Sequence, residues 1–209
     1  MKPKTIFLDL DGVLVDFESG VYEIVKRYSD SPDLMNTLTQ EKREAVKMML
    51  RKMDGEGVSK TTVAELLRDK LDKETLRDLV SMDKNWWANL GWMSDGKELW
   101  NFMRKYDPII LSSDFDRTNS TQGKTKWVKK NLGPDVRVII VDNKGDYATP
   151  DSLLIDDRQF VLDGFMDAGG QGLLHISTEN TIEEITSRYA LNESNNHFRY
   201  IKSFKDWNK

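Results

Sequence analysis

Residues 6–17 of this chain read IFLDLDGVLVDF, and the expected fold follows from this stretch. The apolar run 5–8 predicts a short buried strand, which stops at two aspartates separated by one leucine and followed by glycine. Alternation along an extended chain places Asp9 and Asp11 on the same side, and Gly12 allows the backbone to turn away. Two like charges at the end of a buried strand repel each other, so the pattern indicates a bound cation or a reaction that uses both acids. The alternative interpretation is a strand running into a loop whose acids are only solvated.

The composition is that of a soluble protein with one core, or with a core domain and a smaller inserted one: 209 residues, 32% charged, 38% hydrophobic and a formal net charge of -4. This charge lacks the basic footprint of a protein that binds duplex nucleic acid. No run approaches the ~20 apolar residues of a membrane span. Residues 1–4 lead straight into a strand rather than a signal peptide, so we expect no membrane association.

Residue types that are rare or missing limit which metal ions the chain could bind. There is no cysteine, which excludes disulfides and thiolate metal sites and favours the cytoplasm. With two histidines in the whole chain, a histidine-rich transition-metal centre is not expected. A bound metal would therefore be held by oxygen atoms, which favours Mg²⁺. Nothing in the sequence decides between a monomer and a homodimer.

Apolar runs that begin at residues 5, 108, 136, 152 and 173 predict five strands, and helical spacing predicts helices between them. The predicted fold class is α/β, a doubly wound parallel sheet. Residues 18–93 contain helical patterns only, so we expect a helical cap of residues 18–93 inserted after the first strand. A catalytic core would then comprise residues 1–17 and 94–209. The tail 191–209 is expected to pack back as a helix, and 169–172 to form a turn.

Polar residues close two further predicted strands. The run 108–113 ends in Ser112 and Ser113, and the run 152–158 ends in Asp156 and Asp157. Carboxyl ends of parallel strands share one edge of a sheet, so these groups should lie near Asp9.

A lysine-rich helix is expected over residues 120–132. Its other lysines (Lys126, Lys129, Lys130) fit a solvated face, but Lys124 shares a face with Trp127 and Val128. Lys124 also lies in the first helical turn, where a cation is disfavoured unless an anion is near. The helix begins at the carboxyl edge of the sheet, so Lys124 is expected to project toward Asp9.

These segments together resemble the haloacid dehalogenase (HAD) superfamily. Residues 6–17 resemble its first motif, the strand ending in Ser112 its second, and LLIDDR over 153–158 its fourth. Within the superfamily, DLDGVLVDF and KTKWV over 124–128 look most like the 5'(3')-deoxyribonucleotidases. The resemblance covers about residues 4–17 and 108–158.

The resemblance implies a magnesium-dependent phosphomonoesterase that forms an aspartyl-phosphate. By it, Asp9 is the nucleophile, Asp11 the general acid and base, and Ser112 and Lys124 stabilise the phosphoryl group. Asp9, the Asp11 carbonyl and Asp157 would hold Mg²⁺, with Asp156 holding a metal-bound water or the catalytic lysine. Lys144 resembles a basic residue that contacts substrate in the family.

The substrate expected by resemblance is a small phosphomonoester, a nucleoside monophosphate. Three tryptophans lie within residues 86–92, and such rings either stack on a base or pack where the cap rejoins the core. The candidate substrate-binding residues are Phe17, Trp86, Trp87, Ser113 and Lys144. Alternatives are a capped phosphatase for another small phosphomonoester or for a nucleic-acid terminal phosphate, and a non-catalytic nucleotide-binding module.

Overall fold

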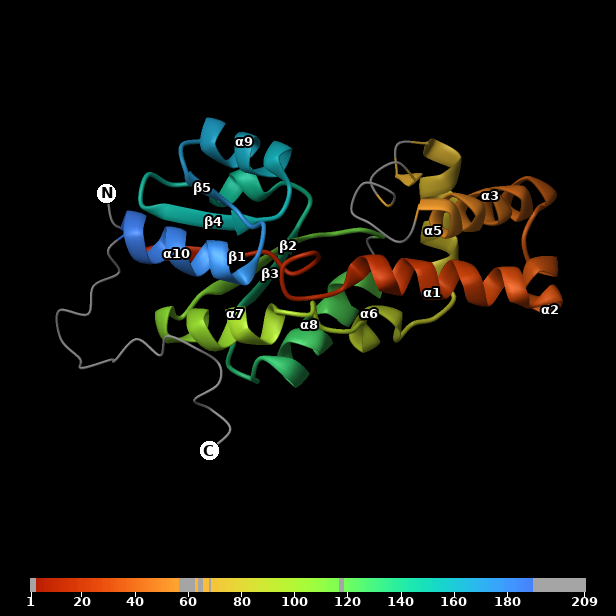
Figure 1. Ribbon diagram of the computed structural model, residues 1–209, viewed down its shortest axis with the longest axis horizontal. Coiled ribbons are helices and arrows are strands. Elements are labelled where there is room, and N and C mark those ends of the chain that lie inside the picture. The colour runs from red at the N-terminus through yellow and green to blue at the C-terminus, as the bar shows by residue number, and fades with distance from the viewer. Residues whose placement is uncertain (1–2, 57–62, 64–65, 68, 117–118, 190–209) are drawn as a thin grey trace.

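The computed structural model describes residues 3–56, 63, 66–67, 69–116 and 119–189. These residues form a parallel sheet of five strands in the order β3-β2-β1-β4-β5 (Figure 1). The strands are β1 (Thr5–Leu8), β2 (Ile109–Ser113), β3 (Val138–Val141), β4 (Ser152–Asp156) and β5 (Gln171–Leu174). The predicted α/β class is therefore confirmed, and β1, the strand that precedes Asp9, lies at the centre of the sheet.

Both faces of the sheet are apolar, as expected for a parallel sheet covered on two sides. Along β1, Ile6 and Leu8 belong to one hydrophobic cluster and Phe7 to another. The first cluster includes side chains of α7 (Gly96–Met103), α8 (Asn119–Asn131) and α10 (Thr178–Tyr189). The second includes side chains of α9 (Gln159–Asp167), and the short helix η2 (Lys144–Tyr147) packs on α9. The sheet is thus doubly wound.

A second group of helices lies between β1 and β2 in the sequence and to one side of the sheet (Figure 1). These helices are α1 (Phe17–Asp30), α2 (Pro32–Asn36), α3 (Gln40–Glu56), α5 (Lys70–Ser81) and α6 (Trp86–Asn89). They share a hydrophobic cluster of their own, which includes Val25, Met49 and Leu79. Met49 and Met53 are buried in this cluster, whereas Met48 is half exposed. The division into core and cap at residues 18–93 stays a prediction.

The chain enters and leaves this group of helices through two neighbouring segments, residues 14–16 and 91–93. Val15 and Trp92 form an antiparallel bridge. The Asp16 amide donates to the Gly91 carbonyl at 3.0 Å, and the Met93 amide donates to the Leu14 carbonyl at 2.9 Å. The two connecting segments therefore run side by side.

Several predicted boundaries were wrong. β3 begins at Val138 rather than at residue 136, and β5 begins at Gln171, inside the predicted turn, because Gln171 and Gly172 pair with β4. After α7 the chain forms the 3-10 helix η1 (Arg104–Tyr106), which ends at Asp107 with a φ of 48°. The helix expected in 191–209 lies outside the described residues.

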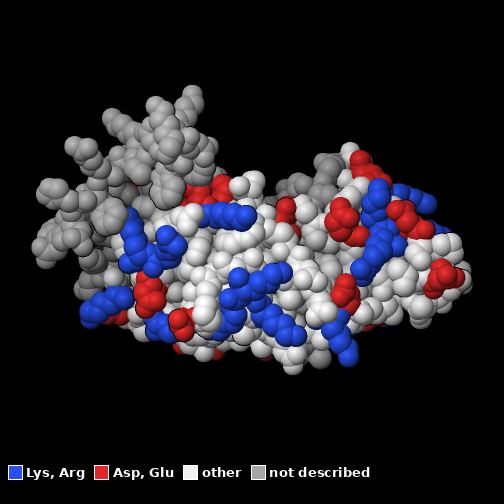
Figure 2. Space-filling model, turned by 90° about the horizontal axis from the view of Figure 1, so that it is seen from below, with Lys and Arg blue, Asp and Glu red and all other residues white. Residues whose placement is uncertain are grey.

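No helix in the described part of the chain is long and apolar enough to cross a membrane. On the face shown in Figure 2, basic side chains lie in several separate groups, with acidic side chains between them.

Candidate functional site

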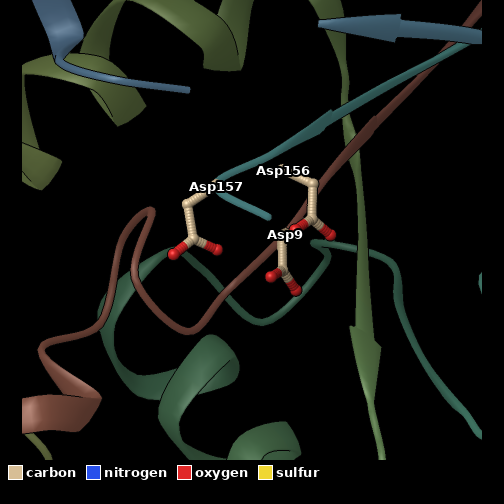
Figure 3. A group of neighbouring side chains, drawn as sticks. All are labelled: Asp9, Asp156 and Asp157. Atoms are coloured by element: carbon tan, nitrogen blue, oxygen red, sulfur yellow. The ribbon is translucent and has the colours of Figure 1, made fainter. Parts of the chain in front are cut away.

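Three carboxylates meet where β1 and β4 end. The two strands are paired in register up to Leu8 and Ile155, so that the residues that follow, Asp9 and Asp156, are neighbours. Asp9, Asp156 and Asp157 each offer an oxygen atom, and these atoms lie within 4.8 Å of one another (Figure 3). Asp9 is 1% exposed and Asp156 is fully buried. The acids of the two predicted motifs therefore converge, and an all-oxygen donor set of this kind suits a hard divalent cation.

The turn after Asp9 brings the backbone against this cluster. Gly12 has a φ of +76°, and its amide donates to the Val15 carbonyl at 2.9 Å. A Cβ atom at Gly12 would lie 2.4 Å from Oδ2 of Asp157. Glycine is thus required here twice, for its positive φ and for its lack of a side chain.

Replacing Gly12 by alanine will displace Asp157 and weaken cation binding. We expect the free energy of unfolding in EDTA to fall by about 1–2 kcal/mol from the left-handed backbone alone. Added Mg²⁺ is expected to raise the melting temperature of the wild-type protein but not that of the variant, since the new Cβ moves Asp157 away from the cluster. Urea unfolding and thermal melts with and without Mg²⁺ measure both effects.

The control for this prediction is Gly164→Ala in α9, where no atom lies within 4 Å of an added Cβ. This variant should gain about 0.5–1 kcal/mol, because alanine restricts the unfolded chain. Wild-type stabilisation by Mg²⁺ in Gly12→Ala would contradict the role given to this turn.

Lys144 supplies the positive charge beside Asp9. Its Nζ lies 2.6 Å from Oδ1 of Asp9 and 2.6 Å from Oδ2 of Asp156, and the residue is 3% exposed. It opens η2, where the Asn143 side chain accepts the Gly145 amide at 3.1 Å. The lysine in contact with Asp9 is Lys144, whereas Lys124, expected to project toward Asp9, contacts the neighbouring Asp11. Lys144 is held by two buried carboxylates, and its contact with a substrate stays a prediction.

The surroundings separate the pKa values of the two buried acids. Burial raises the pKa of Asp9, but the positive charges of Lys144 and Arg158 outweigh it and hold the pKa below its ordinary value. Burial and the negative charge of Asp9 raise the pKa of Asp156 to about 6, against the opposing effect of Lys144 and Arg158. Asp9 is therefore ionised at neutral pH, as a nucleophile must be.

Lys124 holds a second polar group together. Its Nζ donates to Oδ2 of Asp11 at 2.5 Å, to Oγ of Ser112 at 3.2 Å and to the Ser113 carbonyl at 2.7 Å. Lys124 is 2% exposed and Ser112 is fully buried. The neighbouring Lys126 is exposed, so the distinction made from helical spacing is confirmed.

The aromatic residues predicted to bind a base are packed against one another. Trp87 is 1% exposed and Trp86 7%. Phe17 stacks on Trp87 with ring centroids 5.6 Å apart, and Trp86 meets Trp87 edge-on at 4.7 Å. Phe115 adds a fourth ring, 5.5 Å from Trp87. The expectation that Trp86 and Trp87 offer ring faces to a base is therefore wrong, because other rings occupy that space. Phe17 and Phe115 are only half-buried.

Arg158 received no role from the sequence, although it follows the acid pair directly. Its Nε lies 3.6 Å from Oδ1 of Asp156, and its guanidinium lies 5.4 Å from the centroid of the Phe160 ring, which is 70% exposed. The carboxylates of Asp9 and Asp156 raise its pKa despite burial. The sequence signal for this third positively charged side chain is that Arg158 directly follows the two acids.

Comparisons with known proteins concern the fold. No protein-family model matches this chain, and no curated protein matches it in sequence. Its structure is similar to that of a hydrolase from Streptococcus pneumoniae TIGR4, with 14% identity and a TM-score of 0.46 over 88% of this chain and 99% of that one.

Two further similar structures differ in what their descriptions say. YfnB of Bacillus subtilis, described as a HAD-hydrolase bound to magnesium, has 14% identity and a TM-score of 0.45 over 83% of this chain and 87% of that one. The L-2-haloacid dehalogenase of Xanthobacter autotrophicus has 13% identity and a TM-score of 0.45 over 89% and 83% of the two chains. These similarities are too low to assign an activity to this chain.

Proposed function

We propose that this protein is a HAD-type phosphomonoesterase that depends on magnesium and works through an aspartyl-phosphate on Asp9. The observation that carries the proposal is the environment of Asp9. This carboxylate is buried against the Lys144 ammonium, belongs to a cluster of three acids, and lies two residues before an acid paired with a second buried lysine.

The residues present fit a divalent cation. The three clustered acids (Asp9, Asp156, Asp157) meet two cations (Lys144, Arg158), which leaves an excess of one negative charge. Oxygen donors and this charge are what Mg²⁺ prefers. Asp9, Asp157 and the Asp11 carbonyl would hold the ion, and Asp156 would contribute through a bound water while it holds Lys144. When bound, the ion supplies positive charge that lets an anionic nucleophile meet an anionic phosphate.

The proposed reaction has two displacements at phosphorus. In the first, an oxygen of Asp9 forms a bond to phosphorus, the bond to the leaving oxygen breaks, and the Asp11 carboxyl gives that oxygen its proton. In the second, Asp11 takes a proton from water, the water oxygen bonds to phosphorus, and the bond to Asp9 breaks. Inorganic phosphate leaves, and both aspartates return to their starting protonation states.

Ser112 and Lys124 would stabilise the phosphoryl oxygens, Lys124 by exchanging one of its present acceptors for a phosphoryl oxygen. The Ser112 hydroxyl and the Lys124 ammonium lie 3.2 Å apart, and Lys124 also contacts Asp11. Hydrogen-bond donors fixed in a buried site stabilise developing charge without having to reorganise. Lys144, which contacts Asp9, offsets the negative charge of the nucleophile while it is free.

We further propose a nucleoside monophosphate as the substrate, with α1 to α6 as the cap. The half-buried rings of Phe17 and Phe115 support this choice, since they are the less buried members of the aromatic group. Phe17 is the last residue of the first motif and Phe115 follows the strand that ends in Ser112 and Ser113, so both rings are attached close to the proposed phosphate site.

A substrate panel tests the proposal. The purified chain should release phosphate from a generic aryl phosphate with Mg²⁺ and release none in EDTA. Nucleoside 5'- and 3'-monophosphates should be hydrolysed faster than sugar phosphates. Equal rates on sugar phosphates would reject the nucleotide substrate. Nucleotide binding without turnover would indicate a binding module instead.

A further inference from the structure

The Lys124 ammonium is buried between three hydrogen-bond acceptors and one aromatic ring. Three acceptors, Oδ2 of Asp11, Oγ of Ser112 and the Ser113 carbonyl, match the three N–H bonds of an ammonium. The indole ring of Trp87 covers the group from another direction, with Nζ 4.7 Å from the ring centroid. A cation at this distance from an indole face is attracted by the ring, more strongly when water is excluded.

Trp87 is itself held in place from both sides. Its ring stacks on Phe17, and its Nε1 donates to Oδ2 of Asp116 at 3.3 Å. The other carboxylate oxygen of Asp116 accepts the Asn119 and Ser120 amides at 2.8 Å each, at the start of α8. One side chain thus ties the indole to the first turn of the helix that carries Lys124.

A close contact between α8 and Trp87 also fixes the position of Lys124. A Cβ atom at Gly123, the residue before Lys124, would lie 2.3 Å from Cβ of Trp87. Helix α8 therefore rests directly on Trp87 at this turn, and a shift of the tryptophan would be transmitted to Lys124. Trp87 belongs to α6, within the helices inserted after β1, whereas the three acceptors of Lys124 belong to β2 and the turn after β1.

We propose that Trp87 is a positioning residue that keeps the Lys124 ammonium dry and directed at Asp11 and Ser112. The inference rests on the proposed function, in which Lys124 acts on the phosphoryl group. Its consequence is that the inserted helices contribute to the reaction through Lys124 as well as by covering the site. If the indole were core packing alone, its replacement would change stability and leave Lys124 where it is.

The experiment compares Trp87→Leu, which removes the ring face, with Trp87→Phe, which keeps one. The control is Trp100→Leu, a loss of a similarly buried indole from α7. Each full-length variant is treated with acetic anhydride while folded, and acetylation of Lys124 is quantified by peptide mass spectrometry. kcat and KM are measured on an aryl phosphate with Mg²⁺. If Trp87→Leu does not fold, Trp87→Met replaces it as the variant without a ring.

We expect acetylation of Lys124 to rise about tenfold in Trp87→Leu and kcat to fall about tenfold with KM nearly unchanged, because the loss is in transition-state stabilisation. Trp87→Phe should recover most of both effects, and Trp100→Leu should leave Lys124 protected. Wild-type protection of Lys124 in the ring-less variant, or equal exposure in Trp100→Leu, would overturn the inference. A wild-type protein with no turnover on any phosphomonoester would reject the proposed function, and the labelling would still decide the placement of Lys124.

Discussion

Asp9→Asn will lose phosphatase activity completely within the limit of the assay, a fall in kcat of about 10,000-fold or more. The amide is close in size and shape to the carboxylate, but it is uncharged and cannot form the acyl-phosphate bond. Release of phosphate from an aryl phosphate in Mg²⁺ measures the effect. Circular dichroism and urea unfolding establish that the variant is folded.

Asp163→Asn is the control for this substitution, because Asp163 is an exposed acid on α9 that accepts a bond from Gln159. It should retain wild-type turnover. The intermediate can be sought separately in Asp11→Asn, where the second displacement lacks its base and phosphate should remain on Asp9 after acid quenching. Turnover in Asp9→Asn comparable to that of Asp163→Asn would remove Asp9 from the mechanism.

Lys144→Met should destabilise the metal-free protein by about 3–5 kcal/mol, since it leaves two buried carboxylates without their shared cation. Methionine has nearly the volume of lysine, so the loss reflects charge rather than a cavity. Added Mg²⁺ should restore part of the stability because the ion places positive charge at the same acids. Urea unfolding in EDTA and in Mg²⁺ provides both numbers.

The effect of Lys144→Met should depend on pH in a defined direction. The pKa of Asp156 is already raised to about 6 from 3.8, and loss of Lys144 raises it further. The folded state then holds a proton on Asp156 more tightly than the unfolded chain does, so stability is lost as pH rises from the unfolded pKa through the folded pKa. The loss of unfolding free energy in Lys144→Met should therefore be smaller at about pH 5 than at about pH 8.

Lys126→Met, at an exposed position on α8, is the matched control, with an expected change of about 0.5 kcal/mol or less. Equal losses in the two lysine variants, or a deficit in Lys144→Met that does not change with pH, would show that Lys144 is not the charge partner of the buried acids.

Local pattern was sufficient to find the five strands, although not the first residues of β3 and β5. The strands β1, β2 and β4 are buried apolar runs that end abruptly at acids or serines, and parallel strands bring such ends to one edge. That rule alone placed Asp9 beside Asp156 and Asp157. The buried position of Lys124 followed in the same way, because helical spacing set it on the face of Trp127 and Val128 rather than with the exposed lysines.

The partner of Asp9 could not be predicted in this way. Lys144 lies in a polar loop after β3, and β3 is separated from β1 by β2, so strand order alone places it too far away. Only the path of η2, packed on α9, brings its side chain to Asp9 and Asp156. The burial of Trp86 and Trp87 could not be predicted for a related reason, since rings distant in sequence pack against them, Phe17 against both and Phe115 against Trp87.

At the bridge between Val15 and Trp92, the inserted helices are connected to the rest of the chain by two adjacent backbone segments. Because these two segments are adjacent, a short loop could connect them directly in place of the helices. The acids at the ends of β1 and β4 would then keep their scaffold, and helices of another size could be grafted at the same point. The replacement helices would have to provide a new aromatic ring over Lys124, because Trp87 belongs to the inserted part of the chain.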